Sequence, residues 1–123
     1  MLKRIIKFRV WDEKTNSWDR CKDGSHFCLY PETELLSNGR VFQQYTGLKD
    51  KNDKEIFEGD ILKHLIDEDE FLSERTANRE IIFNNGIFGL PCVIFKNNVD
   101  NLRYYSQIGE VIGNIFENPE LLK

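Results

Sequence analysis

Glu58 and Asp60 flank Gly59 and are the most chemically suggestive pair of side chains in this 123-residue sequence. On a strand, residues two apart project from the same face, with Cβ atoms roughly 7 Å apart. Such a pair could bind a divalent cation or support acid–base chemistry. A structural interpretation is favoured, because two carboxylates alone supply neither a nucleophile nor a third ligand. In that interpretation Gly59 forms a bulge and Asp60 accepts hydrogen bonds from nearby backbone amides.

Three cysteines and two histidines raise the question of a metal site. Cys21, His26 and Cys28 lie close together in sequence, and Cys92 or His64 could complete a tetrahedral zinc site. No cysteine pair has the C-x-x-C spacing, and Cys28 and Cys92 lie in apolar runs where cysteine behaves as a small buried hydrophobe. We therefore expect no metal and no other cofactor. The odd number of cysteines favours reduced thiols in the cytoplasm over an extracellular disulfide scaffold.

The sequence contains no nucleophile elbow, phosphate-binding loop or metalloprotease helix. His26 and His64 are the only side chains that ordinarily titrate near neutral pH, and neither belongs to a recognisable motif. Asn114, Glu117 and Asn118 are polar residues in an apolar segment and could line a pocket. The favoured interpretation is structural: Asn114 satisfies a backbone turn, and Asn118 caps a final helix. We predict no catalytic residues, with a carboxylate-dependent hydrolase as the minor alternative.

Nucleic-acid binding is a more serious hypothesis, because the N-terminal segment carries a positive cluster uninterrupted by acids: Lys3, Arg4, Lys7 and Arg9. Trp11 and Trp18 follow closely and could stack on bases. The whole chain, however, has a formal net charge of -4 and a pI of about 5.2. A short basic cluster in such a chain is typical of a solvated strand face. Nucleic acid is therefore possible as a partner but not favoured.

Protein contacts form the preferred class of function. Phe71 and Leu72 interrupt an acidic segment and could anchor a partner. The apolar run 87–95, if it forms an edge strand, could pair with a second copy of the chain. We expect an unidentified protein partner or a homo-oligomer. Binding whose affinity falls steeply with salt would argue against this class and favour nucleic acid.

The composition is that of a folded globular protein, with 40% hydrophobic, 12% aromatic and 31% charged residues. Its length suits one domain over residues 1–123. No apolar stretch reaches the 18 or so residues that a membrane-spanning helix needs. A secretory signal requires an apolar segment after its basic N-terminus, and this sequence has none there. We expect no membrane association and a cytoplasmic location.

Alternation and turn signals predict six or more short strands. Ile6, Phe8 and Val10 should share one face of the first strand, opposite Lys7, Arg9 and Trp11. The predicted strands cover residues 3–12, 17–21, 27–30, 41–46, 56–66, 81–83, 87–88 and 109–116. Pro91 suggests an edge strand or bulge, and residues 100–107 suggest one or two helical turns capped by Asp100. Together these elements predict a mainly β, small β-barrel-like domain with a short C-terminal helix that starts at Asn118-Pro119.

Three stretches of the sequence, residues 6–12, 44–61 and 111–122, resemble the YopX family of small phage and prophage proteins in order and spacing. The matching positions, of unknown role, are Trp11, Asp12, Gln44, Tyr45, Thr46, Gly47, Glu58, Gly59, Asp60, Gly113, Asn114, Glu117, Asn118 and Pro119. The resemblance implies a mostly β fold with a barrel-like core and a cytoplasmic location in an infected or lysogenic bacterial cell. It implies no biochemical activity.

Two positions depart from the family pattern. Asp53 stands where the family usually has glycine, and Phe116 stands where tyrosine is commoner. Because Asn and Asp both tolerate left-handed backbone conformations, we expect the Asn52-Asp53 turn to survive. The segments 22–40 and 67–101 show no such resemblance.

Overall fold

The computed structural model describes residues 6–18, 27–28, 39–66, 75–84, 86–91 and 99–123. The chain forms two compact units, Met1–Gly47 and Leu48–Lys123, here called the first and second units. Within the described residues no helix is long and apolar enough to cross a membrane. The prediction that residues 1–123 make a single domain stays a prediction.

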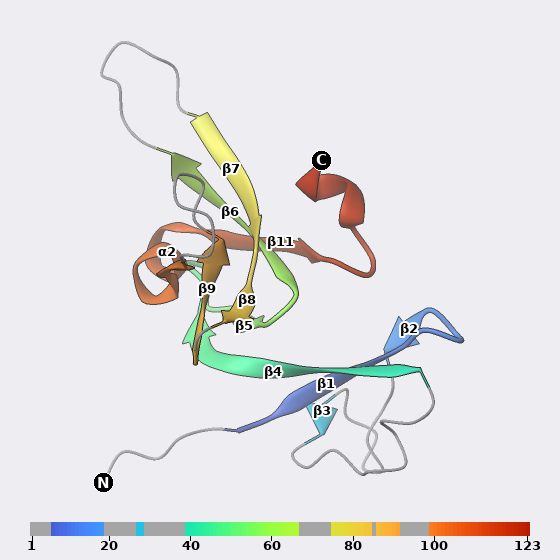
Figure 1. The fold of residues 1–123 in the computed structure, drawn as a ribbon. Coiled ribbons are helices and arrows are strands. Elements are labelled where there is room, and N and C mark those ends of the chain that lie inside the picture. The colour runs from blue at the N-terminus through green and yellow to red at the C-terminus, as the bar shows by residue number, and fades with distance from the viewer. Residues whose placement is uncertain (1–5, 19–26, 29–38, 67–74, 85, 92–98) are drawn as a thin grey trace, which may run out of the picture. The chain divides into compact units, whose positions relative to one another are not determined.

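The first unit is built from antiparallel strands around β1 (Phe8–Asp12). This strand pairs with β2 (Ser17–Trp18), with β3 (Phe27–Cys28) and with the long β4 (Arg40–Lys49), beside which it runs in Figure 1. The β1–β2 connection is the predicted polar turn, in which Asn16 adopts a φ of 51°. Such left-handed backbone suits asparagine better than most residues.

The alternation predicted for β1 does not separate a buried face from an exposed one. Val10 and Trp11 lie on opposite faces, yet they are only 1% and 5% exposed. Both faces of this part of the strand are therefore covered. The observed β1 is also shorter than predicted, and residues 3–5 and 19–21 lie outside the described part of the chain.

The second unit contains two three-stranded antiparallel sheets. One has the order β11-β6-β7 and consists of β11 (Glu110–Asn114), β6 (Asp60–Ile66) and β7 (Arg75–Glu80). The other has the order β10-β9-β8 and consists of β10 (Val99–Asn101), β9 (Ile87–Pro91) and β8 (Ile82–Asn84). The remaining elements are β5 (Glu55–Phe57), helix α2 (Leu102–Ile108) and the 3₁₀ helix η1 (Pro119–Leu122), which ends the chain in Figure 1.

The core of the second unit gathers one apolar side chain from each of several elements. Its five buried members are each at most 2% exposed: Ile56, Leu62, Ile81, Leu90 and Leu102. Leu48, Phe88, Tyr105 and Val111 pack against them. Burial of such side chains is the main stabilising contribution in a domain of this size. The prediction of a mainly β fold with a short helix towards the C-terminus is confirmed.

Several boundaries were predicted wrongly. The segment 56–66 is two strands, because Gly59 adopts a φ of +83° and turns the chain between β5 and β6 instead of forming a bulge. Pro91 ends β9, which lies between β8 and β10 and is therefore not an edge strand. Asp100 belongs to β10, and Asn101 caps α2 by accepting a hydrogen bond from the Arg103 backbone amide at 2.8 Å.

Candidate functional site

Glu58 and Asp60, the candidate carboxylate pair, do not share a strand face. Glu58 lies in the turn between β5 and β6, whereas Asp60 is the first residue of β6 and is 2% exposed. The Asp60 Oδ2 atom accepts a hydrogen bond of 2.8 Å from the Phe57 backbone amide. The predicted role for Asp60, a carboxylate that serves backbone amides, is thus confirmed.

Backbone hydrogen bonds join the same turn to the residue before β8 and to the residue after β11. Gly59 donates its amide to the Ile81 carbonyl at 2.8 Å, and its own carbonyl accepts from the Ile115 amide at 2.9 Å. Asp60 lies opposite Asn114 in the strand register. Residues far apart in sequence therefore meet here, and we call this region, residues 58–60 with 113–118, the Asp60–Asn114 junction.

Asn114 organises the chain just after β11. Its Oδ1 atom accepts hydrogen bonds from the backbone amides of Phe116 at 3.0 Å and Glu117 at 2.9 Å. Its Nδ2 atom donates to Glu117 Oε1 at 3.0 Å. The predicted role of Asn114 in satisfying a backbone turn is confirmed, and its amide is committed to this turn.

Asn118 does not cap the final helix as predicted. Its side chain makes no capping hydrogen bond to η1, although Pro119 does occupy the start of that helix. Its Oδ1 atom instead accepts from the Asn114 backbone amide at 3.3 Å. The close approach depends on Gly113, because a Cβ atom at that position would overlap the Asn118 carboxamide.

The remaining motif positions lie in the first unit, around β1 and β4. Asp12 accepts a hydrogen bond from the Lys14 amide at 2.9 Å, and its other oxygen lies 3.6 Å from Arg40 Nη2. Trp11 is buried, and Tyr45 is 4% exposed. Gln44, Thr46 and Gly47 follow along β4, with Gly47 at a φ of +87°. These motif positions therefore belong to strand β1 of the β1–β2 hairpin and to β4, the strand that pairs with β1.

Arg9 of β1 and Lys7, which directly precedes that strand, each lie over an aromatic ring. The Arg9 guanidinium lies 4.5 Å from the Trp18 ring centroid, and its Nε donates to Gln43 Oε1 at 2.9 Å. The Lys7 ammonium lies 4.9 Å from the Tyr45 ring centroid. Trp11 meets Trp18 in an edge-to-face contact with centroids 5.0 Å apart. Buried Trp11 cannot stack on a base, and Lys3 and Arg4 lie outside the described residues.

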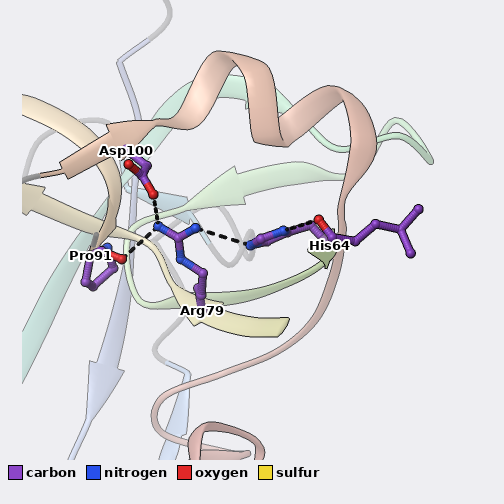
Figure 2. Close-up of polar contacts among 5 residues, drawn as sticks. His64, Arg79, Pro91 and Asp100 are labelled. Atoms are coloured by element: carbon purple, nitrogen blue, oxygen red, sulfur yellow. Dashed lines mark hydrogen bonds and ion pairs between the residues drawn. The ribbon is translucent and has the colours of Figure 1, made fainter. Parts of the chain in front are cut away.

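A cluster that the sequence did not reveal lies in the second unit around Arg79, which is 9% exposed (Figure 2). Its Nη2 atom donates to Asp100 Oδ2 at 2.6 Å and to the Pro91 carbonyl at 2.7 Å. Its Nη1 atom lies 3.4 Å from His64 Nε2. The guanidinium also lies over the Tyr105 ring, at 5.1 Å from the centroid. One cation thus connects β6, β7, β9, β10 and α2; we call these residues the Arg79 cluster.

The partners of His64 determine its protonation. Its Nδ1 atom lies 2.9 Å from the Leu65 carbonyl, which can only accept, so Nδ1 carries the proton. Arginine can only donate, so Nε2 must be the unprotonated acceptor. The ring is therefore neutral. Burial lowers the pKa of His64 below its ordinary value of 6.5, and the Arg79 charge lowers it further.

A protein-family comparison covers almost the whole chain. The family described as YopX protein matches residues 7–123. The chain belongs to the YopX family. The resemblance seen in the motif residues is confirmed, and the YopX motifs of both units can now be placed in the structure.

A solved relative agrees with the fold of this YopX chain. The crystal structure of protein EF1440 from Enterococcus faecalis is 31% identical in sequence, with a TM-score of 0.59. The similarity covers 98% of this chain and 100% of the relative. No curated protein matches.

The other candidate ligands of the YopX chain do not converge in the described residues, where no group of three or more His, Cys, Asp or Glu side chains could hold a metal ion. Cys21, His26 and Cys92 lie outside the described residues, as do Phe71 and Leu72. The Cys28 backbone lies in β3. The only sequence signal for the Arg79 cluster was His64 itself, which stands in an apolar run without a neighbouring partner.

Proposed function

We propose that this YopX-family chain is a non-catalytic accessory binding module that acts through a protein partner or a second copy of itself. The β8–β9 hairpin carries the proposal. Phe83 is 55% exposed and Ile87 is 50% exposed, on the two sides of a turn at Gly86. The register places Phe83 beside Phe88 on one face of the hairpin and Ile87 beside Asn84 on the other, so the anchor in this proposal is the Phe83 ring.

The geometry of the Phe83 ring supports the same proposal. This ring packs against Phe88, its register partner, with centroids 4.9 Å apart and planes at 57°. Phe88 in turn packs on the buried core of the second unit. The exposed ring is thus held on a rigid support, which lowers the entropy cost of using it as an anchor.

The candidate acid–base groups support a non-catalytic role. Asp60 and His64 are 2% and 4% exposed, and each is hydrogen-bonded to the protein's own backbone. A group that acts on a substrate must reach it within hydrogen-bonding distance. Both side chains are instead placed to stabilise the second unit.

Site-specific photo-crosslinking in the bacterial host would test the proposal. A benzoyl-phenylalanine that replaces Phe83 should yield a crosslinked species, and its mass should distinguish a dimer of this chain from a different protein. The same probe at Leu122, which is 39% exposed on η1, is the matched control and should yield less product. Absence of any product at position 83, or equal yields at the two positions, would overturn the assignment of this hairpin.

Family membership also supports a cellular setting. We place the protein in the cytoplasm of a host bacterial cell and infer that it is encoded by a phage or prophage. Cell fractionation with an antibody against the chain tests the location. Recovery in the culture medium or in the membrane fraction would contradict it.

Weak nucleic-acid binding is the alternative function, supported by two cations close together in sequence, Lys7 just before β1 and Arg9 within it. Fluorescence polarisation with labelled single- and double-stranded oligonucleotides should be compared at about 50 mM and about 200 mM salt. Binding that collapses at the higher salt and is lost in a K7Q/R9Q variant would favour this alternative. We expect no such binding, because both cations already lie over aromatic rings.

A further inference from the structure

The Arg79 cluster places a ring that can gain a proton beside a cation that cannot lose one. His64 and Arg79 are 4% and 9% exposed, and 3.4 Å separates Nε2 from Nη1. A guanidinium keeps its charge at every physiological pH. The contact therefore exists only while the imidazole is neutral, because an imidazolium has no lone pair at Nε2 to offer.

We propose that His64 and Arg79 form an acid-sensitive latch, in which protonation of His64 breaks the contact with Arg79 and loosens β9, β10 and α2 from the β6–β7 hairpin. The proton would add to Nε2 and make an imidazolium adjacent to the guanidinium. The lost hydrogen bond and the repulsion between two buried cations both oppose that form.

The connections of Arg79 decide which elements respond. Its Nη2 atom joins the Pro91 carbonyl at the end of β9 to Asp100 in β10. Tyr105 of α2 contacts both His64 and Arg79. Its ring centroid lies 4.5 Å from the centroid of the His64 ring and 5.1 Å from the Arg79 guanidinium. A displaced guanidinium would disturb all three contacts together. The Asp60–Asn114 junction shares none of the hydrogen bonds described for Arg79.

Within the described residues, β6, β7, β10 and α2 each supply a group that faces His64. Arg79 on β7 opposes protonation, and Asp100 on β10 favours it. Tyr105 of α2 contributes a ring face, and the Leu65 carbonyl on the same strand favours the charged form. Burial is the largest influence and opposes protonation, so the pKa of His64 lies below 6.5. A group whose folded-state pKa is lowered supports stability above its ordinary pKa, and this support is lost as the pH falls.

The window of the latch therefore begins as the pH falls below about 6.5 and closes at the lowered pKa of the folded protein. Within that window, opening that hydrates His64 should become about tenfold more frequent for each pH unit. Amide hydrogen exchange in α2 and β10, corrected for its intrinsic pH dependence, measures this change residue by residue.

An NMR titration of the full chain should show His64 with a pKa below 6.5, accompanied by shifts of the Asp100 and Tyr105 amides at the same midpoint. His64→Gln is the informative variant, because its Oε1 can still accept from Arg79 but cannot titrate. It should abolish the transition. His26→Gln is the matched control, since it removes the other histidine of the sequence and should leave the transition unchanged.

Three results would overturn the latch: a His64 pKa at or above 6.5, a His64 titration without accompanying shifts of the Asp100 and Tyr105 amides, or a transition that persists in His64→Gln. A second variant keeps the proposal testable if His64→Gln does not fold. Asp100→Asn removes the charge that favours the imidazolium and should lower the His64 pKa further. An unchanged or raised pKa in that variant would also contradict the proposal.

Discussion

The two polar clusters of the second unit are built in contrasting ways. In the Asp60–Asn114 junction, short side chains bind backbone amides within four residues of themselves, as Asp60 does with Phe57 and Asn114 with Phe116 and Glu117. In the Arg79 cluster, one long side chain reaches His64, Pro91 and Asp100, which lie 12 to 21 residues away in sequence. The junction fixes local turns, whereas the cluster joins elements that the turns have already formed.

The comparison has an energetic consequence. The Phe57 amide that Asp60 serves lies in a buried segment, so losing that acceptor leaves a donor without a partner. The Asp100 side chain in the Arg79 cluster remains 32% exposed, so water can replace its lost partner. The junction should therefore be the more sensitive of the two to substitution, even though the cluster contains the stronger charges.

Asp60→Ala should have the largest effect. It removes the acceptor of the Phe57 amide from a residue that is 2% exposed, and we expect a loss of about 3 kcal/mol in the free energy of unfolding. Urea denaturation followed by circular dichroism measures it. Glu58→Ala, in the same turn but half-exposed, is the control and should cost much less. A cost below about 1 kcal/mol for Asp60→Ala would remove the basis of the comparison.

Arg79→Met should cost less, about 2 kcal/mol, because methionine keeps most of the apolar stem while the Asp100 carboxylate can be hydrated. The buried Nε of Arg79 has no hydrogen-bond partner among the described residues, so its removal costs nothing at that atom. The same denaturation experiment compares the two variants directly. If Arg79→Met proves more destabilising than Asp60→Ala, the cluster and not the junction is the main polar support of the second unit.

Glu80→Gln should change how the stability of the protein depends on pH. The change in stability should be smaller than the losses expected for Asp60→Ala and Arg79→Met. Glu80 follows Arg79 on β7 and lies opposite Ile61 in the register. Burial raises the pKa of Glu80 above 4.5, so the folded protein holds this proton more tightly than the unfolded chain does. Stability from that proton is present below pH 4.5 and is lost as the pH rises through the raised value.

Glutamine cannot ionise, so Glu80→Gln should be more stable than the natural chain at pH 7 and nearly equal to it at pH 4. Unfolding midpoints in urea at the two pH values supply the measurement. Half-exposure of the side chain limits the size of the gain. A variant that is less stable at pH 7 would show that the Glu80 carboxylate has a stabilising partner.

Asp53→Gly should have the smallest effect and serves as a local reference outside both clusters. Asp53 adopts a φ of 67°, a backbone conformation that glycine occupies without strain. We expect the variant to gain about 0.5 kcal/mol, because its ion pair with Lys49, at 3.7 Å between exposed side chains, contributes little. Thermal unfolding can detect this change. A loss of stability instead would indicate that the Asp53 side chain matters more than its backbone conformation.

What the sequence predicted follows the same contrast between local and distant contacts. The turn at Asn52-Asp53, the hairpin turn at Gly86 and the backbone role of Asn114 all depend on neighbouring residues, and each was predicted correctly. The exchange of roles between Asp100 and Asn101 at the start of α2 shows the limit of such rules. Asp and Asn both cap helices well. Arg79, distant in sequence, binds the Asp100 carboxylate, and Asn101 caps the helix.

Strand β7 and the Arg79 cluster could not be predicted for a related reason. The β7 sequence, from Arg75 to Glu80, carries little apolar alternation, so it has no strand signal of its own. It becomes a strand because β6 offers it a complete set of register partners. Likewise, nothing near His64 in the sequence indicates that an arginine 15 residues later will share its hydrogen bond.

Asp50 has a consequence for how the protein is made. One of its carboxylate oxygens accepts from the amides of Asn52 and Lys54, and the other accepts at 2.8 Å from Val111, which is 61 residues further along. On the ribosome the first two bonds can form as soon as the turn emerges. The third must wait until Val111, 61 residues after Asp50, has been synthesised. The nascent chain thus forms the turn first, and the second carboxylate oxygen of Asp50 gains its partner only when β11 has been made, so β11 docks late in the biogenesis of this unit.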